Sequence, residues 1–516
     1  MSDITTTEYD PAIEAKASTP APVRSFTIYG LYGYRTVSIH SPHSATVLIA
    51  RNGAGKTTLI SALYAILVGQ FSRLRDIDFS YLVLELKDLD PVTITSQDIE
   101  EYFNFAEESE ISKQARKMDI DPFDFFRFLM EDYPHLKGNY RALHDHPIYN
   151  SIQRFVGYNT MEVDDFLESL SESDEVKSTA IYSIYQTIEI SISNYDVIYL
   201  PTYRRIELPL SRTFATRKRR KRPGYAMRNI DTSALVGDIQ FGLQDISDHL
   251  EDLNRQILFD SGFGYRRISA DIISEMIQSD LDGVTSETTA IPQADELSLF
   301  FSRLKESRHN GPFLDDMAIP NIELAYETSS KPTDSGKFLK YFLGKLNSVI
   351  QETKTIEQSV QSFVESCNKY LSSQDISTSV KSDRTHPDKT VTPDDKVLIL
   401  NRQNLAVHAE SLIGNRVISL DALSSGEKQM ISLFAKLYLY EKEKIVLIDE
   451  PELSLSLDWQ RQILTDVLRA PLCAQIIAIT HSPFVFDNEL EPYARALEID
   501  VDLSALPSDS QNERKL

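Results

Sequence analysis

The sequence predicts an α/β fold in which a parallel sheet is interrupted by long, mainly helical insertions. Two observations near the ends of the chain predict the sheet. An apolar run, Ala45–Ile49, enters a glycine-rich loop, and a second one, Ile445–Ile448, ends in two acids. A third observation, acidic segments rich in Phe and Tyr such as DPFDFFRFLMEDY, predicts the helices between them. Short apolar runs followed by loop residues are typical of buried parallel strands.

The chain begins with a segment that predicts no fold. Residues 1–23 are rich in Thr, Ala, Pro and acids, which indicates a flexible tail without an apolar targeting segment. The next run, RSFTIYGLYGYRTVSIH, predicts two strands around a glycine turn. These strands lead directly into the glycine-rich loop.

The stretch IARNGAGKTTLI, Ile49–Ile60, matches a phosphate-binding loop except that Ala50 stands where the pattern G-x-x-x-x-G-K-[ST] has glycine. A left-handed Ala50 would cost about 1 kcal/mol if the turn needed one. Small residues let backbone N–H groups approach phosphate oxygens, Lys56 adds a charge toward the β- and γ-phosphates, and the Thr57 hydroxyl suits Mg²⁺. A helix is expected to follow at Thr58–Leu67, as such a loop requires. The residues predicted to bind nucleotide here are Asn52, Gly53, Ala54, Gly55, Lys56, Thr57 and Thr58.

Composition and charge restrict the kind of protein. With 516 residues and 41% hydrophobic content, the chain can bury more than one core. Cys367 and Cys473 lie far apart and lack metal-ligand spacing, which fits a reducing interior. No apolar run is long enough to cross a bilayer, so we expect a cytoplasmic protein without membrane contact. A net charge of −24 disfavours nonspecific nucleic-acid binding by the whole surface.

Composition also predicts domain limits. Two lobes and a return strand in YDVIYLPTYRRIE are expected to build the sheet, with helical insertions between them. The second insertion includes ISDHLEDLNRQIL and a long helical stretch from Lys337 to about Leu371. We expect helices of ordinary length there, interrupted by Pro, Gly and Phe clusters, without sustained heptads. The predicted limits are 1–23 tail, 24–105 lobe 1, 106–190 insertion, 191–212 return strand, 213–390 insertion, 391–505 lobe 2 and 506–516 tail.

Two adjacent carboxylates follow the apolar strand in the C-terminal part of the chain. Asp449 and Glu450 come directly after Ile445–Ile448, and the carboxyl ends of parallel strands open into the crevice where ligands bind. Asp449 is predicted to organise Mg²⁺ and its waters, and Glu450 to orient and deprotonate an attacking water. An apolar run before Asp-Glu is a weak signal alone, so its neighbours in the sequence matter.

Further motifs lie on either side of these acids: LSSGEKQM, Leu423–Met430, and IIAITHSP, Ile476–Pro483. With them the chain resembles the ATP-binding-cassette (ABC) superfamily, in which phosphate loop, LSGGQ-like signature, Asp-Glu strand and switch histidine occur in this order. The resemblance covers residues 24–105 and 390–505. It implies an α/β ABC ATPase head, a P-loop NTPase, that is split by a large, mainly helical insertion.

The resemblance implies an ATPase that uses ATP and Mg²⁺, with Thr57 and Asp449 at the metal. His481 follows a predicted strand as the switch histidine does, and it would contact the γ-phosphate and the attacking water beside Glu450. The signature residues open an amphipathic helix, where N–H groups and the helix dipole form an anion site. In the family this site faces the γ-phosphate on another subunit, so ATP closes a homodimer or higher oligomer and hydrolysis opens it. The signature residues are Ser424, Ser425 and Gly426.

The chain departs from the family pattern at some positions. The signature has Ser425 for the first Gly and Glu427 for Gln, changes that are common among members resembling RecF, RecN and the chromosome-maintenance ATPases. The loop PELSLSLDWQ resembles the interfacial D-loop, with Ser454 as its contact across the dimer. The open candidates are Gln70 and Gln97 for the Q-loop glutamine, and Tyr32 and Tyr34 for the adenine-stacking residue.

Three further motifs narrow the resemblance. GLYGYRTVSI, YLPTYRRIE and LSSGEKQ look most like ATPases of bacterial antiphage systems, namely the ATPase of Septu and its relative in retron operons, which pair with a separate HNH nuclease. A nuclease domain of the Toprim kind is not expected, because 35 residues follow His481. The cluster LHDHP, with His144, Asp145 and His146, lacks the further partner of an HNH site, so a helix–helix loop is the favoured interpretation.

A basic run and the overall role stay open on the sequence. The run Arg217–Arg222 holds six consecutive cations, and it fits equally a solvated loop or a site for nucleic acid, either retron RNA or DNA or phage DNA. One candidate function is a regulatory ATPase that controls a partner nuclease in antiphage defence. The other is a RecF/RecN-like DNA-repair or chromosome-maintenance ATPase. The expected lack of heptads favours the first.

Overall fold

The structure is a computed structural model. It describes residues 10–51, 53–137, 143–144, 146–201, 243–278, 290–307, 320–331, 333–371, 396–412, 416–454 and 457–502. The chain divides into two compact units: unit 1 is residues 1–240 with 441–516, and unit 2 is residues 241–440. The predicted lobe 391–505 therefore falls partly in each unit, and the predicted domain limits stay a prediction. Within the described residues, no helix has the length and apolar character needed to span a membrane.

Unit 1 contains a parallel sheet built from both ends of the chain. Its strands are β3 (Ala45–Ile49), β6 (Tyr195–Leu200), β10 (Glu443–Asp449), β11 (Cys473–Thr480) and β12 (Ala494–Ala496). Among the described residues the strand order is β12-β3-β11-β10-β6, and every pairing is parallel. Val446, Leu447 and Ile477 are fully buried, as expected of a sheet covered on both faces. The predicted strands before the loop, before the acids and in YDVIYL are confirmed.

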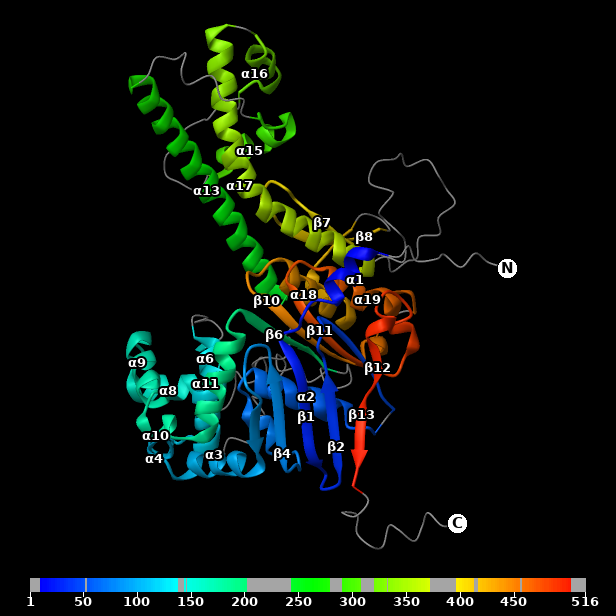
Figure 1. Cartoon of the computed structure of the whole chain (residues 1–516). Helices are drawn as coiled ribbons and strands as arrows, with labels where there is room; N and C mark the ends of the chain where they lie inside the picture. Colours follow the sequence, from blue (N-terminus) through cyan, green and yellow to red (C-terminus); the bar gives the residue numbers. More distant parts are fainter. Residues whose placement is uncertain are drawn as a thin grey trace, which may run out of the picture. The chain divides into compact units, whose positions relative to one another are not determined.

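A second, antiparallel sheet packs in the same unit. Its strands are β1 (Val23–Leu31), β2 (Arg35–His40), β4 (Tyr81–Leu86), β5 (Val92–Thr95) and β13 (Glu498–Val501), in the order β13-β2-β1-β4-β5 (Figure 1). β1 and β2 are the predicted hairpin. Helix α2 (Lys56–Leu67) belongs to one hydrophobic cluster with residues of both sheets, including Phe26 and Leu447. Because α2 is buried among apolar side chains, the packing of the helix holds the end of the preceding loop in place.

The first insertion is helical, as predicted. Its elements are α3 (Ser96–Glu108), α4 (Glu110–Lys117), α5 (Pro122–Arg127), the π-helical turn η2 (Phe128–Asp132), α6 (Tyr133–Leu136), α8 (Pro147–Val156), α9 (Thr160–Ser171), α10 (Asp174–Lys177) and α11 (Ala180–Ile192). Thr95 and Asp98 form a capping box at the start of α3. Phe125, Phe126 and Phe128 are buried, which explains the aromatic content of this segment.

Residues 11–17, predicted to belong to a flexible tail, instead form helix α1 (Pro11–Ala17). The helix packs on α19 (Leu457–Arg469), and it buries Ile13 and Ala17. Asp10 caps its N-terminus and pairs with Arg469 at 3.2 Å, while the Lys16 ammonium donates to the Ala470 carbonyl at 2.7 Å. The apolar positions in this segment are few, and their partners lie more than 400 residues away in the sequence, so composition alone missed the helix.

Unit 2 contains the helices α13 (Leu243–Gln278) and α17 (Asp334–Leu371), of 36 and 38 residues. The long helical stretch predicted from Lys337 to about Leu371 is confirmed as α17. The prediction of helices of ordinary length was wrong, since an average helix has roughly 11–12 residues. The two helices run antiparallel and pack together with α15 (Ala294–Ser307), while α16 (Ile322–Ser329) packs on α17 (Figure 1). An added Cβ on Gly264 would lie 2.6 Å from Val349, so this glycine permits the close approach of α13 to α17.

The rest of unit 2 gathers at one end of this helix pair. The strands β7 (Lys396–Leu400), β8 (Val407–Ser411) and β9 (Arg416–Ile418) form an antiparallel sheet, and helix α18 (Ser425–Tyr438) follows. The Tyr370 and Phe434 rings lie 5.4 Å apart, and the Ser366 hydroxyl donates to Tyr438 at 3.0 Å. On α13, the His249 Nε2 lies 2.9 Å from the carbonyl oxygen of Leu439, the residue that follows α18. Both long helices are thereby attached to α18.

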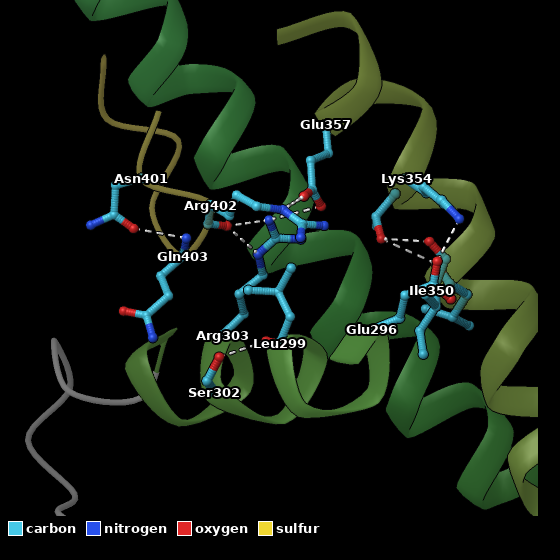
Figure 2. A network of polar contacts seen from close by, with 12 residues as sticks. Glu296, Leu299, Ser302, Arg303, Ile350, Lys354, Glu357, Asn401, Arg402 and Gln403 are labelled. Carbon is cyan, nitrogen blue, oxygen red and sulfur yellow. Dashed lines mark hydrogen bonds and ion pairs between the residues drawn. The ribbon is translucent and has the colours of Figure 1, made fainter. Parts of the chain in front are cut away.

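An ionic triad, of which Arg303 and Glu357 are buried and Arg402 is exposed, connects α15, α17 and the turn after β7 (Figure 2). The Arg303 guanidinium lies 3.1 Å from one Glu357 oxygen, and the Arg402 Nε lies 2.5 Å from the other. Arg303 also donates from Nε to the Arg402 carbonyl at 3.1 Å. Arg303 and Glu357 are 4% and 5% exposed, so each charge depends on its partners in place of water.

Candidate active site

The phosphate loop joins β3 to the N-terminus of α2. Gly53 and Gly55 have φ angles of 78° and 86°, a left-handed backbone that glycine adopts without strain. Ala50 is not among the residues with positive φ, so alanine at this position needs no left-handed backbone. Its N–H donates to the Thr480 carbonyl at 3.2 Å, which ties the entrance of the loop to β11. Asn52 lies outside the described residues.

Four polar side chains from two distant segments meet at the start of α2. The Lys56 ammonium donates to Glu450 Oε1 at 2.6 Å, and the Thr57 hydroxyl donates to Asp449 Oδ2 at 2.7 Å. Lys56 and Asp449 are buried. The parallel strands β3, β11 and β10 end at the same edge of the sheet, which brings the loop and the two acids together.

The backbone of Glu450 is strained. Its φ of 54° places a non-glycine residue in the left-handed region, and its N–H donates to the Ile479 carbonyl at 2.8 Å. Such a conformation costs on the order of 1–3 kcal/mol and is found mainly where function requires a side chain to point in one direction. The turn directs the Glu450 carboxylate toward Lys56 instead of continuing β10.

The residues present fit Mg²⁺ and a nucleotide. The Thr57 hydroxyl and the Asp449 carboxylate are hard oxygen donors next to the loop, and Mg²⁺ in such sites takes its remaining ligands from phosphate and water. Gly53 and Gly55 have the left-handed backbone that anion-binding nests use. Within the described chain, no group of three or more His, Cys, Asp or Glu side chains is arranged to hold a metal by itself.

His481 lies beside the acids, at the end of β11. Its Nδ1 is 3.9 Å from Glu450 Oε1 and 2.7 Å from Glu452 Oε1. Glu452 is not among the site residues predicted from the sequence. The motif Asp-Glu-Pro-Glu carried a signal for it, namely a second acid directly after the strand end, yet nothing in the sequence says which acid faces the histidine.

The signature segment starts helix α18 in unit 2. Ser424 is the exposed N-cap residue: its hydroxyl accepts from the Glu427 N–H at 3.3 Å, and Glu427 accepts from the Ser424 N–H at 2.7 Å. Burial raises the pKa of Glu427, but hydrogen bonds from Lys396 and Ser424 outweigh it and hold the pKa below its usual value. The pattern S-x-x-E is a capping-box signal that the sequence already contained. Ser425 and Gly426 form the first turn of the helix.

The tyrosine candidates differ in their surroundings. The Tyr32 hydroxyl lies 3.2 Å from the Thr58 hydroxyl, and the exposed ring follows a left-handed backbone with φ of 54°. Tyr34 lies under the guanidinium of Arg35, which donates to the Gly53 carbonyl at 3.0 Å. Tyr32 therefore contacts the helix that begins with Lys56, while Tyr34 is already stacked on a cation.

The glutamine and D-loop candidates stay predictions. Gln70 is buried and precedes the short helix η1 (Phe71–Leu74), whereas Gln97 is exposed and pairs with Glu101 on α3 at 2.9 Å. Ser454 ends the turn η6 (Pro451–Ser454), whose backbone is described. The basic run Arg217–Arg222 lies outside the described residues.

The histidine cluster LHDHP is a connection that leads into α8. His146 is buried 3.7 Å from Asp132, and burial lowers the pKa of His146 to about 4 and raises that of Asp132 to about 7. His144 is exposed, and Asp145 lies outside the described residues. A neutral, buried histidine beside one acid fits the favoured interpretation of a structural loop.

Comparison with known proteins adds to this geometry. Residues 294–487 match a family model described as "AAA domain, putative AbiEii toxin, Type IV TA system", a range that includes Asp449, Glu450 and His481. No curated protein matches the chain. A similar solved structure is the Smc head domain with an extended coiled coil, bound to the C-terminal domain of ScpA, from Pyrococcus furiosus. It has 12% sequence identity and a TM-score of 0.31, and the match covers 95% of this chain and 98% of that chain. A TM-score this low supports no functional conclusion.

The loop, the acids and the matched family define the class: the chain is a P-loop ATPase. Its α/β fold is interrupted by a large helical region, as the sequence predicted. The matched segment begins at the start of α15 and ends after β11. It therefore includes part of the helical region as well as β10, the strand that ends in Asp449.

Proposed function

We propose that this chain is an ABC-type ATPase of the cytoplasm, which couples ATP hydrolysis to the association of two heads and thereby controls a partner nuclease in antiphage defence. The observation that carries the catalytic part is the meeting of Lys56 and Thr57 with Glu450 and Asp449. Residues that would hold the nucleotide, Mg²⁺ and the attacking water are thus gathered at one sheet edge.

In the proposed reaction the Lys56 ammonium breaks its hydrogen bond to Glu450 and binds the phosphates of the nucleotide instead. That exchange releases the Glu450 carboxylate, which then accepts a proton from the attacking water. Thr57 and Asp449 would hold Mg²⁺, which neutralises charge on the phosphate oxygens. His481 contacts the γ-phosphate from the end of β11, and Tyr32 offers its exposed ring to the adenine.

The signature helix is suited to transmit a change. Ser424 is exposed at the N-terminus of α18, where the helix dipole favours an anion such as the γ-phosphate of a second subunit. The same helix contacts α17 through Phe434 and Tyr438, and α13 through its neighbour Leu439. A displacement of α18 on ATP binding would therefore move the long helices.

A mixing experiment tests the shared site. Ser424→Arg places a long cation at the proposed contact between subunits, and Lys56→Ala disables the loop in a separate variant. Each variant alone should lose most ATP hydrolysis. The equimolar mixture should recover hydrolysis, because a heterodimer combines one intact loop with one intact signature. Hydrolysis is measured as phosphate release at matched protein concentration.

The matched control for Ser424→Arg is Ser348→Arg, which places the same cation at an exposed serine on α17. This variant should hydrolyse ATP like the wild-type chain without any mixing, because Ser348 lies outside the signature. If the mixture of Ser424→Arg with Lys56→Ala hydrolyses no more ATP than the sum of its parts, the sites are not shared between subunits.

The defence role rests on the family match, the sequence motifs and an exposed apolar surface. The description of the family matched by residues 294–487 names a putative toxin of a toxin–antitoxin system. The motifs of the sequence resemble those of Septu and retron ATPases. The first insertion exposes Tyr158, Met161 and Ile190, apolar side chains that suit a protein partner. The HNH-type nuclease, like binding of retron RNA or DNA or phage DNA at Arg217–Arg222, is part of this proposal.

Partner and nucleic acid can be tested in one preparation. The chain, produced together with an HNH protein encoded beside its gene, should retain that protein on affinity purification. Serine at all six positions of Arg217–Arg222 should leave ATPase activity and the partner in place and flatten the salt dependence of nucleic-acid binding. Failure to retain the HNH protein contradicts the nuclease role, and an unaltered salt slope contradicts the nucleic-acid site.

The long helices favour the second candidate, a DNA-repair or chromosome-maintenance ATPase, more than the sequence did. α13 and α17 form an antiparallel pair, an arrangement that also suits an arm reaching toward DNA. This candidate predicts ATP-dependent binding to DNA ends by the chain alone. Equal binding with and without ATP would argue against it.

A further inference from the structure

Glu452 is held between two residues at the end of β11. Its Oε1 accepts from the His481 backbone N–H at 3.0 Å and lies 2.7 Å from the His481 ring Nδ1. Its Oε2 accepts from the Thr480 hydroxyl at 2.8 Å. The Glu452 side chain is 6% exposed, whereas the His481 side chain is 45% exposed. A buried carboxylate thus binds the inner side of a histidine whose outer side is open.

This arrangement determines which ring nitrogen is available. A carboxylate oxygen 2.7 Å from Nδ1 favours a proton on that nitrogen, which leaves Nε2 as the nitrogen that can face a ligand. The hydrogen bond from the His481 backbone N–H to Glu452 fixes the backbone position from which the imidazole ring projects. The Thr480 hydroxyl donates to the other carboxylate oxygen, Oε2, which does not face His481. A histidine oriented by a carboxylate on its far nitrogen is a recurring arrangement in catalytic and metal sites.

Glu452 is not positioned to act as the general base for the attacking water, the role proposed for Glu450. Its carboxylate is buried and engaged by donors on both oxygens, so an attacking water has little access to it. Glu450 instead lies against Lys56 at the loop. On this geometry the two acids of Asp-Glu-Pro-Glu have different tasks.

We propose that Glu452 is a positioning residue for ATP hydrolysis, which holds His481 with Nδ1 protonated and Nε2 directed toward the γ-phosphate. The inference rests on the proposed role of His481. It adds a residue that acts through His481 and touches neither the nucleotide nor the attacking water.

The test is a double-mutant cycle. Glu452→Ala should lower kcat for ATP by about 10- to 100-fold with little change in KM, the range found when partners of site ligands are removed. In a His481→Ala background the same change should have almost no further effect, because the residue on which Glu452 acts is gone. Glu452→Gln, which keeps one oxygen that can face both the His481 backbone N–H and Nδ1, should restore most of kcat.

Thr480→Val is the matched control. It removes the other hydrogen bond of the Glu452 carboxylate, keeps the volume of the side chain and leaves the His481 contacts, so its kcat should stay near that of the wild type. If Thr480→Val loses as much activity as Glu452→Ala, the carboxylate supports the strand end only. The positioning role is then overturned.

Further outcomes separate this inference from the proposed function. An unchanged kcat in His481→Ala removes the role of His481 itself. A lowered kcat in His481→Ala with unchanged kcat in Glu452→Ala overturns the positioning role alone. Should Glu452→Ala fail to fold, ¹⁵N NMR of the histidine rings in the wild-type chain still decides. The signal lost in His481→Ala should show protonated Nδ1, and a bare Nδ1 contradicts the inference.

Discussion

Glu450→Gln is expected to lower the turnover number for ATP by about 100-fold or more, the contribution of a well-placed general base. Glutamine keeps the shape of the side chain on its strained backbone and removes the group that accepts the proton. ATP should still bind, because the loop, Lys56 and Thr57 are intact. Phosphate release measures turnover, and equilibrium binding of a fluorescent ATP analogue measures affinity.

Lys56→Ala is the informative companion to Glu450→Gln. It removes the charge directed at the phosphates and should weaken binding of the same analogue, while Glu450→Gln should not. Turnover in Glu450→Gln equal to that of the wild-type chain would exclude Glu450 as the base. Equal loss of binding in both variants would mean that Glu450 supports the loop, through its bond to Lys56, more than the reaction.

Glu357→Ala is expected to reduce the free energy of unfolding of unit 2 by about 3–5 kcal/mol. The substitution leaves the buried Arg303 without its carboxylate, and an uncompensated buried charge carries that penalty. Arg402 loses the same partner. Urea-induced unfolding of the full chain, followed by far-UV circular dichroism, measures the loss as an earlier transition.

The control for Glu357→Ala lies on the same helix. Glu365 is exposed on α17, so Glu365→Ala should change the free energy of unfolding by less than about 0.5 kcal/mol. Replacing the whole triad, as Arg303→Met, Glu357→Leu and Arg402→Met, should recover much of the stability lost in Glu357→Ala, because no buried charge remains. Equal transitions in Glu357→Ala and Glu365→Ala would contradict the stabilising role of the triad.

The parts of the site that could be predicted are those whose chemistry is local. Gly53, Gly55, Lys56 and Thr57 are neighbours in the chain, and the backbone geometry they need is fixed by their own types. The strand before Asp449 could be predicted because a buried parallel strand requires an unbroken apolar run. The signature is a local motif, and its capping box of Ser424 and Glu427 is equally local.

Other features depend on partners far away in the sequence. The side chain of Glu452 contacts a histidine 29 residues later, and only the alignment of β10 with β11 selects this acid for it. The length of α13 and α17 depends on mutual burial along the pair, because tertiary packing supplies most of the stability of a helix in a protein. The short helix α1 likewise depends on tertiary packing, because it packs against α19.

The sequence by itself determined that this chain has a phosphate-binding loop and an acidic strand end in an α/β fold, since these features follow from residue type and short-range spacing. The tertiary structure alone decided that Lys56 faces Glu450, that Thr57 faces Asp449 and that Glu452 holds His481. Spacing along the chain carries no information about such pairs. They arise because parallel strands from opposite ends of the chain finish at one edge of the sheet, and burial of the surrounding apolar residues fixes their register.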